Sequence, residues 1–234
     1  MKTVISVSGG MDSVTLLHKL VNEGKEVYAL SFNYGQVHKK ELEMAKYQCE
    51  LLNVPHKIVD ITFLRDLLPS ALTGTVKVPE GHYESESMKQ TVVPFRNSIL
   101  ASITLGYASG IHADEIALGV HAGDHLIYPD CRPIYIEALT QLAKVGDFKE
   151  IKVYTPYLNI TKVEILAEGL KLGVDYAKTW TSYSGGDEPD YKTGSSVERT
   201  QAFIANGIKD PSYSDKNWEK AKEYATTVKP NENE

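Results

Sequence analysis

The chain has 234 residues, of which 42% are hydrophobic and 24% charged, and its formal net charge is −6. This length allows one large domain or two small ones, with a sizeable buried core. The composition excludes disordered, collagen-like and coiled-coil chains. The acidic balance argues against a protein that coats nucleic acid.

No targeting or membrane segment is predicted. Met1 leads directly into a short β-branched run, and no stretch approaches the ~18 apolar residues that cross a bilayer. We therefore expect a soluble cytoplasmic protein that binds neither membranes nor nucleic acid. Cys49 and Cys131 are the only thiols. They are expected to be reduced, and two of them cannot build a four-thiolate zinc site.

Short apolar runs alternate with amphipathic stretches along the chain. Strands are predicted at 2–7, 26–32, 57–60, 115–118 and 152–154. Helices are predicted at 13–22, 39–52, 97–109, 134–144, 162–172, 196–206 and 216–226. Strands that alternate with helices at this spacing imply right-handed βαβ units. The fold class is therefore α/β, with a parallel sheet that carries helices on both faces.

Two segments interrupt this alternation. Residues 67–91 contain several prolines and glycines with little periodicity, which predicts a long surface excursion, either a lid or a disordered insertion. Residues 176–195 are rich in Ser, Gly, Asp and Thr. We accordingly divide the chain into a nucleotide-binding domain at 1–175, a C-terminal loop and helical extension at 176–228, and a polar tail at 229–234.

Residues 8–13 read Ser-Gly-Gly-Met-Asp-Ser and stand where the first strand meets the first helix. Gly9 and Gly10 permit a close approach to an anion, and N–H groups at the helix start point at it. The Ser8 and Ser13 hydroxyls add donors. Asp12 would repel phosphates, so it either holds Mg²⁺ or caps the helix. The alternative is a plain strand-to-helix turn in which the glycines serve geometry alone.

This loop has no lysine at the Walker A position. It resembles instead the pyrophosphate loop of the N-type ATP pyrophosphatases, whose pattern is Ser-Gly-Gly-x-Asp-Ser. Those enzymes cleave ATP between the α and β phosphates and adenylate an oxygen of the substrate. The resemblance implies a Rossmann-like sheet of the adenine nucleotide alpha hydrolase type, with ATP across the strand ends.

Four further stretches narrow the family. They are Phe32-Asn33-Tyr34-Gly35-Gln36-Val37-His38 with Glu41, Val93-Pro94-Phe95-Arg96-Asn97, Gly119-Val120-His121 with Asp124 and Tyr128-Pro129-Asp130-Cys131-Arg132, and Thr161-Lys162 with Glu164. Together with the loop, this set resembles the 7-cyano-7-deazaguanine synthase family, which makes preQ0 for queuosine. The resemblance runs from Lys2 to about Gly207.

The residues in these stretches also have chemical readings of their own. Gln36 and His38 follow the second strand and can hydrogen-bond to a nucleotide or substrate, or simply form a helix entry. Arg96 at a helix start can hold a phosphate or a carboxylate, or form a surface ion pair. Lys162 either neutralises phosphate charge or is a solvated helix-start lysine.

Asp124 and Asp130 bracket Tyr128 and offer metal contacts or acceptors for a guanine-like ring edge. Asp130 is equally well explained as an N-cap or turn residue. Cys131 has no second thiol nearby and is expected to be a packed small residue.

With the resemblance included, sixteen positions become candidate site residues. The catalytic candidates are Asp12, Ser13, Arg96 and Lys162. ATP is assigned to Ser8, Gly9, Gly10, Asp12, Ser13, Phe32, Tyr34, Gln36 and Gly119, with Mg²⁺ at Asp12. The substrate is assigned to Gln36, His38, Arg96, Asn97, Asp124, Tyr128 and Asp130.

The family reaction implies an ATP-dependent carbon–nitrogen ligase. The carboxylate of 7-carboxy-7-deazaguanine is adenylated, ammonia displaces AMP to give an amide, and a second activation dehydrates the amide to the nitrile. Mg²⁺, lysine and backbone N–H groups would screen the triphosphate. The family is commonly homodimeric, so a homodimer is expected.

The sequence departs from the family at four positions. The family carries zinc-ligating cysteines in the form Trp-x-Cys-Tyr, then Cys-x-x-Cys-x-x-Cys, then Arg. Here Trp180-Thr181-Ser182-Tyr183 keeps the frame, while the other three positions hold Asp190, Thr193 and Ser196, before Arg199. One anionic and three poor ligands predict that no zinc is bound, with Trp180 and Tyr183 packing the loop instead.

This departure leaves alternatives open. The chain is either a nitrile-forming synthase, a variant that stops at 7-amido-7-deazaguanine, or an enzyme for another carboxylate. From a different class comes a non-catalytic ATP-binding partner subunit. A tRNA-thiolating enzyme is disfavoured because it would want paired reactive cysteines and a basic RNA surface.

Overall fold

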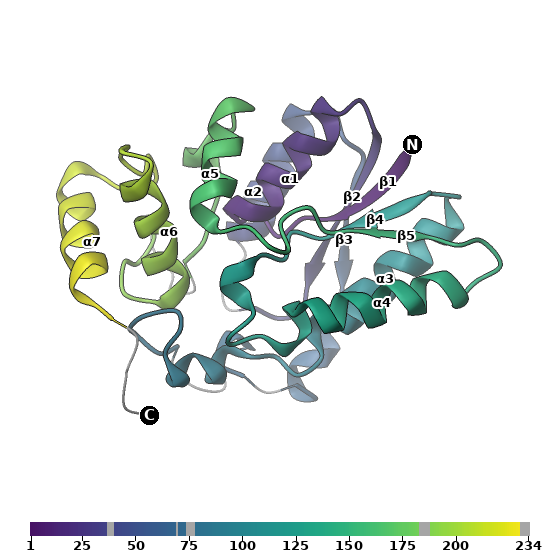
Figure 1. Cartoon of the computed structure of the whole chain (residues 1–234), viewed down its shortest axis with the longest axis horizontal. Coiled ribbons are helices and arrows are strands. Elements are labelled where there is room, and N and C mark those ends of the chain that lie inside the picture. Colours follow the sequence, from purple (N-terminus) through teal and green to yellow (C-terminus); the bar gives the residue numbers. More distant parts are fainter. Residues whose placement is uncertain (37–39, 69, 74–77, 183–187, 230–234) are drawn as a thin grey trace.

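The structure is a computed structural model that describes residues 1–36, 40–68, 70–73, 78–182 and 188–229. Its centre is a five-stranded sheet in the order β3-β2-β1-β4-β5, and every pair of neighbouring strands is parallel (Figure 1). The strands are β1 (Lys2–Ser6), β2 (Glu26–Asn33), β3 (His56–Asp60), β4 (Glu115–Ala117) and β5 (Lys152–Tyr154). The predicted α/β class with a parallel sheet is confirmed.

The helices follow the sequence pattern closely, and each predicted end lies within about two residues of the observed one. They are α1 (Met11–Asn22), α2 (Lys40–Leu51), α3 (Arg96–Gly110), α4 (Pro133–Val145), α5 (Lys162–Lys171), α6 (Gly194–Ala205) and α7 (Asp215–Thr227). The largest differences are at α1 and α6, which both begin two residues earlier than expected.

Side-chain alternation along β1 divides the core into two layers. Ile5 packs with residues of α1 and α5, such as Leu16 and Ile165, whereas Val4 packs with Ala108 of α3 on the opposite face. Helices α1, α2 and α5 thus cover one face of the sheet, and α3 and α4 cover the other (Figure 1).

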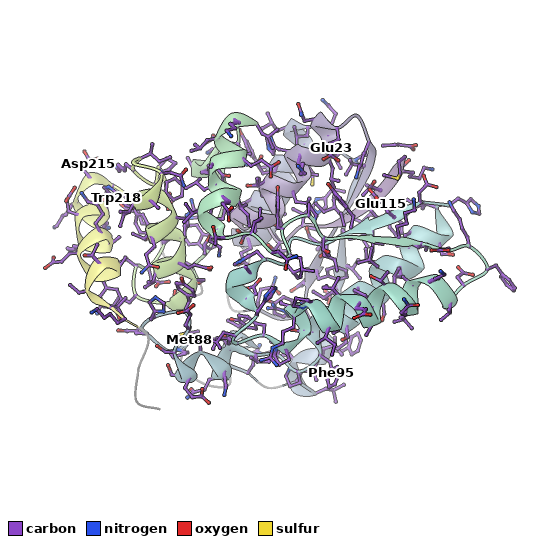
Figure 2. All side chains as sticks on the ribbon, in the orientation of Figure 1. Glu23, Met88, Phe95, Glu115, Asp215 and Trp218 are labelled. Atoms are coloured by element: carbon purple, nitrogen blue, oxygen red, sulfur yellow. The ribbon has the colours of Figure 1, made fainter. Side chains whose placement is uncertain are left out.

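The C-terminal helices α6 and α7 pack on each other and extend the molecule beyond the sheet (Figure 1). Their buried side chains Phe203 and Trp218 share one apolar cluster with Met11 and Val14 of α1. Asp215 lies on the outer surface of this extension (Figure 2). One side of the start of α1 is therefore covered by α6 and α7.

The excursion at 67–91 differs from the surface segment that the sequence predicts. Its described residues form 3₁₀ turns at Ala71–Thr73 and Glu86–Thr91, and Leu72 and Met88 are almost fully buried. These apolar residues are spaced without a period, so the pattern did not distinguish a packed irregular segment from an exposed one. Residues 69 and 74–77, and hence part of the proposed lid, lie outside the described residues.

Both thiols are buried and free. Burial raises the pKa of Cys49 to about 12, and it also raises the pKa of Cys131. Cys131 is the packed small residue that the sequence predicts, and neither thiol is ionised near neutral pH. Within the described ranges, no helix is both long and apolar enough to cross a bilayer.

The strand order positions the functional site. After β1 the chain moves outward in one direction through β2 and β3, then returns to place β4 on the other side of β1. In open parallel sheets a crevice forms at such a reversal, outside the carboxyl ends of the two strands. Here those ends lead into residues 7–10 and 118–121.

Candidate functional site

The loop after β1 is held in shape by its own serines. Ser8 Oγ lies 3.0 Å from Ser13 Oγ, and it also accepts the backbone N–H of Gly10 at 3.2 Å. The Ser13 hydroxyl accepts the Ser8 N–H and donates to the Gly10 carbonyl, both at 3.2 Å. Gly10 is the N-cap of α1. The helix start is thus fixed before any ligand arrives, as anion binding at a helix N-terminus requires.

Gly9 has a packing role rather than a lining role. Its φ is +89°, and a Cβ at this position would come within 2.0 Å of the Glu41 carbonyl oxygen. The Gly9 carbonyl accepts the backbone N–H of Trp180 at 2.9 Å. Of the predicted ATP ligands, Gly9 is therefore the one that does not line the pocket, because its α-carbon is used for the close approach of α2.

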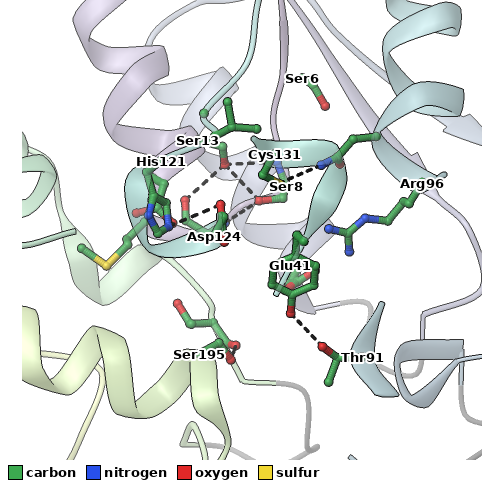
Figure 3. A pocket seen from close by; sticks show the side chains of 18 of the residues that line it. Ser6, Ser8, Ser13, Glu41, Thr91, Arg96, His121, Asp124, Cys131 and Ser195 are labelled. Atoms are coloured by element: carbon green, nitrogen blue, oxygen red, sulfur yellow. Dashed lines mark hydrogen bonds and ion pairs between the residues drawn. The ribbon is translucent and has the colours of Figure 1, made fainter. Parts of the chain in front are cut away.

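A cavity of about 280 Å³ opens at the carboxyl ends of β1 and β4 (Figure 3). Figure 3 places His121 and Asp124 on one side, Arg96 and Glu41 on the other, and Ser8 and Ser13 between them. The predicted site residues that line it are Ser8, Gly10, Asp12, Ser13, Phe32, Tyr34, Gln36, Arg96, Asn97, Gly119, Asp124, Tyr128, Asp130 and Lys162. His38 lies outside the described residues.

One side of the pocket is a dense charge cluster around Lys162. Its ammonium lies 2.6 Å from Glu198 Oε2 and 3.4 Å from Asp12 Oδ2. Burial lowers the pKa of Lys162, but the charges of Asp12, Glu198 and Asp124 outweigh burial and raise it above its ordinary value. With only 7% of its surface exposed, Lys162 is a fixed cation of the pocket and not a solvated surface lysine.

Asp12 is incompletely satisfied. Its Oδ2 faces Lys162 and lies 3.8 Å from His121 Nε2, while its Oδ1 is buried and has no hydrogen-bond partner among the residues that the structure describes. The capping interpretation of Asp12 is wrong, because α1 starts earlier than predicted and Gly10 occupies the cap position. A buried carboxylate oxygen without a donor is a candidate contact for an ion or a water molecule.

The opposite side of the pocket is formed by Tyr34, Glu41 and Arg96. Phe95 adopts the left-handed conformation, with φ of 52°, and α3 begins immediately after it with Arg96. Burial raises the pKa of Glu41 to about 7, even though the positive charge of Arg96 opposes this rise. Burial likewise raises the pKa of Tyr34. Arg96 therefore faces the cavity among polar groups rather than solvent alone.

Asp130 and Asn97 are hydrogen-bonded to each other in the structure without a ligand. Asp130 Oδ2 accepts the backbone N–H of Asn97 at 2.9 Å, and the Asn97 amide donates to Asp130 O at 3.3 Å and Cys131 Sγ at 3.2 Å. Asp130 thus stabilises the first turn of α3 from outside the helix, in the manner of a cap. Next to it, the Tyr128 hydroxyl is 2.7 Å from Thr91 Oγ1.

The Gln36 side chain is similarly hydrogen-bonded to the backbone of its own turn. Its Oε1 accepts the backbone N–H of Tyr34 at 2.9 Å, and its Nε2 donates to the Phe32 carbonyl at 3.1 Å. The side chain closes the loop after β2 while one surface of it still lines the cavity.

Sequence reasoning missed several lining residues. His121 and Glu41 stood in the motif stretches but received no role, although the position of each at a strand or helix end was a usable signal. Tyr83 comes from the excursion, which carries no motif, and Ser195 and Glu198 lie within the zinc-cysteine frame at 180–199, which was interpreted only for its metal ligands. Only the tertiary packing of α6 and the excursion reveals them.

Arg199 anchors the C-terminal wall of the pocket. Its Nε and Nη2 donate to Asp210 at 2.6 and 2.9 Å, and Nη1 donates to Thr179 Oγ1 at 2.7 Å and Thr181 Oγ1 at 3.2 Å. Nη2 also donates to the Tyr176 carbonyl at 3.0 Å. The guanidinium is buried and fully used, so it fixes residues 176–181, of which Trp180 and Thr181 line the cavity.

Comparison with known proteins gives consistent matches. The family described as "Queuosine biosynthesis protein QueC" matches residues 2–207. A 7-cyano-7-deazaguanine synthase of Hahella chejuensis is 54% identical over 90% of this chain and 91% of its own length. The synthase of Caldicellulosiruptor saccharolyticus is 51% identical over 90% and 94%.

Among solved structures, the U34-tRNA thiolase NcsA of Methanococcus maripaludis with its [4Fe-4S] cluster is similar in fold. The TM-score is 0.50 at 18% sequence identity, over 98% of this chain and 74% of that one. This likeness concerns the fold alone.

Proposed function

This chain belongs to the queuosine biosynthesis protein QueC family, and from that premise we propose that its pocket converts 7-carboxy-7-deazaguanine, ammonia and ATP to 7-cyano-7-deazaguanine. The observation that carries the proposal is the pre-shaped loop at 8–13 beside the buried cation Lys162, at the reversal in strand order. This arrangement suits a polyphosphate.

The triphosphate of ATP would lie against the start of α1. The first N–H groups of a helix have no partner within the helix and can donate to a phosphate there. The Ser8 and Ser13 hydroxyls hold the loop in shape. Lys162 adds a positive charge that the fold holds in place, so no reorganisation is needed as charge develops on the departing pyrophosphate.

Magnesium would be held by Asp12. Its Oδ1 lacks a partner among the described residues, and Mg²⁺ in nucleotide sites takes only one or two carboxylates together with phosphate oxygens and water. This agrees with the absence, within the described ranges, of a group of three or more His, Cys, Asp or Glu able to hold a metal. The ion would supply charge screening at the phosphates.

The deazaguanine would lie between Arg96 and Asp124. The guanidinium of Arg96 matches a carboxylate in shape and charge, and Tyr34 and Tyr128 offer ring surfaces beside it. Tyr83, Met88 and Thr91 of the excursion line the same cavity. They would exclude water, which protects an acyl-adenylate from hydrolysis.

The steps follow from these placements. A substrate carboxylate oxygen attacks the α-phosphorus and pyrophosphate leaves, which gives a carboxyl carbon with a good leaving group. Ammonia attacks that carbon and AMP departs, giving the amide. A second ATP adenylates the amide oxygen and releases a second pyrophosphate, and the amide nitrogen loses one proton. Departure of AMP together with the remaining N–H proton then gives the nitrile. The chain's contribution is to orient both substrates and to stabilise the charge on each leaving group.

A product assay tests the proposal. The protein is incubated with 7-carboxy-7-deazaguanine, ¹⁵N-ammonium, ATP and Mg²⁺, and the products are separated by mass. Labelled nitrile is the expected product. Labelled amide alone would replace the proposal by the amide-forming variant, and failure to form any AMP would contradict both.

A matched pair of variants links the assay to the pocket. Lys162→Met should reduce AMP formation by about two orders of magnitude or more, because a fixed positive charge is lost beside the phosphates. Lys171→Met, on the exposed end of the same helix, should retain the activity of the parent protein. Equal activity of the two variants would contradict the role given to Lys162.

A further inference from the structure

Four polar side chains meet where α6 begins. Ser182 Oγ lies 2.5 Å from Asp190 Oδ2, and Thr193 Oγ1 lies 3.2 Å from Asp190 Oδ2 and 3.1 Å from Ser196 Oγ. We name Ser182, Asp190, Thr193 and Ser196 the Asp190 cluster. Ser182, Thr193 and Ser196 are almost fully buried. Tyr183, expected to pack this loop with Trp180, lies outside the described residues.

The Asp190 carboxylate is saturated by donors. Within the described part of the chain, Oδ1 accepts hydrogen bonds from the backbone N–H groups of Lys192 at 3.0 Å and Thr193 at 2.8 Å. Oδ2 accepts hydrogen bonds from the hydroxyls of Ser182 and Thr193. Ser182 Oγ in turn accepts the Asp190 N–H at 3.1 Å. The carboxylate oxygens are therefore hydrogen-bonded without a cation.

Zinc does not fit these residues. A structural zinc site takes thiolates, imidazoles or carboxylates, and three of these four side chains are neutral hydroxyls. The hydroxyls and the carboxylate already bond to one another, so a metal would have to break contacts that satisfy buried groups. The four positions are the ones at which the family resemblance implies zinc-binding cysteines.

The cluster is also joined to the wall of the pocket. Thr193 pairs with Glu80 of the excursion, and the Gly81 N–H donates to the Lys192 carbonyl at 2.8 Å. Next in the chain, Gly194 packs so tightly on Tyr83 and Met88 that a Cβ there would come within 2.9 Å of each. Movement of Asp190 would therefore displace the pocket residues on both segments.

We propose that the Asp190 cluster is a metal-free hydrogen-bond network that takes the place of a structural zinc ion. This network holds the excursion and the start of α6 against the pocket. This chain therefore folds without zinc. The hydrogen bonds of the cluster do the positioning that thiolate–metal bonds do elsewhere, and they do so independently of redox state and of metal supply.

Metal analysis of the full chain is the first test. After purification, zinc should be well below one equivalent, and prolonged treatment with a strong chelator should shift the melting temperature by less than about 1 °C. One equivalent of zinc, removed by the chelator with a large fall in melting temperature, would overturn the proposal. This readout does not depend on the proposed reaction.

Variants of Asp190 test the positioning role. Asp190→Asn should lower the melting temperature by about 5–10 °C, because one charged acceptor and its donors lose their match. Well below that temperature, the KM for ATP should rise about tenfold with little change in kcat, since a displaced wall weakens substrate placement. Ser182→Ala removes a single hydroxyl and should give smaller changes in the same directions.

Asp215→Asn is the matched control, because it makes the same chemical change at an exposed position of the extension. Its melting temperature and KM should equal those of the parent protein. If Asp190→Asn has the same melting temperature and the same KM for ATP as this control, the cluster does not hold the two segments in place and the proposal fails.

Conversion of the cluster into a metal site tests its geometry. The variant that carries S182C, D190C, T193C and S196C should bind one Co²⁺ with the absorption of a tetrahedral thiolate site, and zinc should raise its melting temperature. The parent protein should bind neither ion. A folded four-cysteine variant that takes up no cobalt would show that the four positions do not enclose a metal-sized space, against the proposal.

Discussion

Two polar clusters beside the pocket, one around Asp12 and one around Arg199, differ in how completely their atoms are hydrogen-bonded. Arg199 uses its guanidinium on Asp210, Thr179 and the Tyr176 carbonyl. Asp12 faces Lys162 with one oxygen, whereas its other oxygen has no partner in the described ranges. A satisfied cluster stabilises the fold, whereas we propose that the unpartnered oxygen of Asp12 contacts a bound ion. Substitutions in the two clusters should therefore have opposite consequences.

The largest expected effect is the loss of stability in Arg199→Met. Removal of the guanidinium leaves the buried Asp210 carboxylate without its counter-ion, which costs about 3–5 kcal/mol. Urea unfolding monitored by circular dichroism measures this change. Arg199→Lys should be intermediate, because it keeps the charge but not the forked donors. A stability of Arg199→Met within about 1 kcal/mol of the parent would remove the distinction between the clusters.

The complementary change, Asp12→Asn, should affect activity and not stability. AMP formation should fall about 100- to 1,000-fold, since the Mg²⁺ contact and the pairing with Lys162 are weakened. The free energy of unfolding should change by less than about 1 kcal/mol, because Asp12 is only partly buried and Lys162 keeps its contact with Glu198. An unfolding free energy that falls as far as that of Arg199→Met would place Asp12 among the structural residues instead.

A smaller, pH-dependent effect is expected at Glu41. Its pKa is raised by burial to about 7, so the folded state favours the protonated form. The resulting stability is complete below the unfolded pKa of about 4.3 and is lost as the pH rises through 7. Glu41→Gln removes this loss, so its stability relative to the parent should increase from pH 5 to pH 8.

Glu43→Gln provides the control for this titration, because Glu43 is exposed on the same helix. The difference between the two variants, measured by urea unfolding at both pH values, isolates the pocket carboxyl. A Glu41→Gln profile parallel to that of Glu43→Gln would show that burial does not shift this group.

The smallest effect is expected for the exposed pair of Lys209 and Asp215. Lys209→Met should change the melting temperature by less than about 1 °C, because water and salt screen such pairs. A shift as large as that of Arg199→Met would mean that burial is not what separates strong from weak polar contacts in this extension.

The regular part of the fold was predictable because it depends on local patterns. Helix α5 begins at Lys162 as expected, since Thr161 and Glu164 form a capping box that is visible in the sequence. The burial of the excursion was not predictable, because Leu72 and Met88 are buried by segments that are distant in the sequence. Short-range periodicity contains no information about such contacts.

The same distinction holds within the site. The loop at 8–13 and Lys162 lie at strand and helix ends, where spacing alone suggests a ligand site. Glu198 enters the pocket from the middle of α6, and only the packing of α6 on α5 brings its carboxylate to Lys162. Asp130 was assigned to the substrate, yet its carboxylate supports the first turn of α3. Sequence motifs identify which residues lie near a site, but they do not predict whether a side chain contacts a ligand or another part of the protein.

The shared apolar cluster of α1 and the C-terminal helices has a consequence for synthesis on the ribosome. Met11 and Val14 emerge early, but their partners Phe203 and Trp218 are among the last residues to be made. The apolar side of α1 in the nascent chain therefore lacks its C-terminal partners for nearly the whole of translation. We expect chains that terminate early, after residue 175, to be retained by chaperones or to aggregate, even though they contain every strand of the sheet.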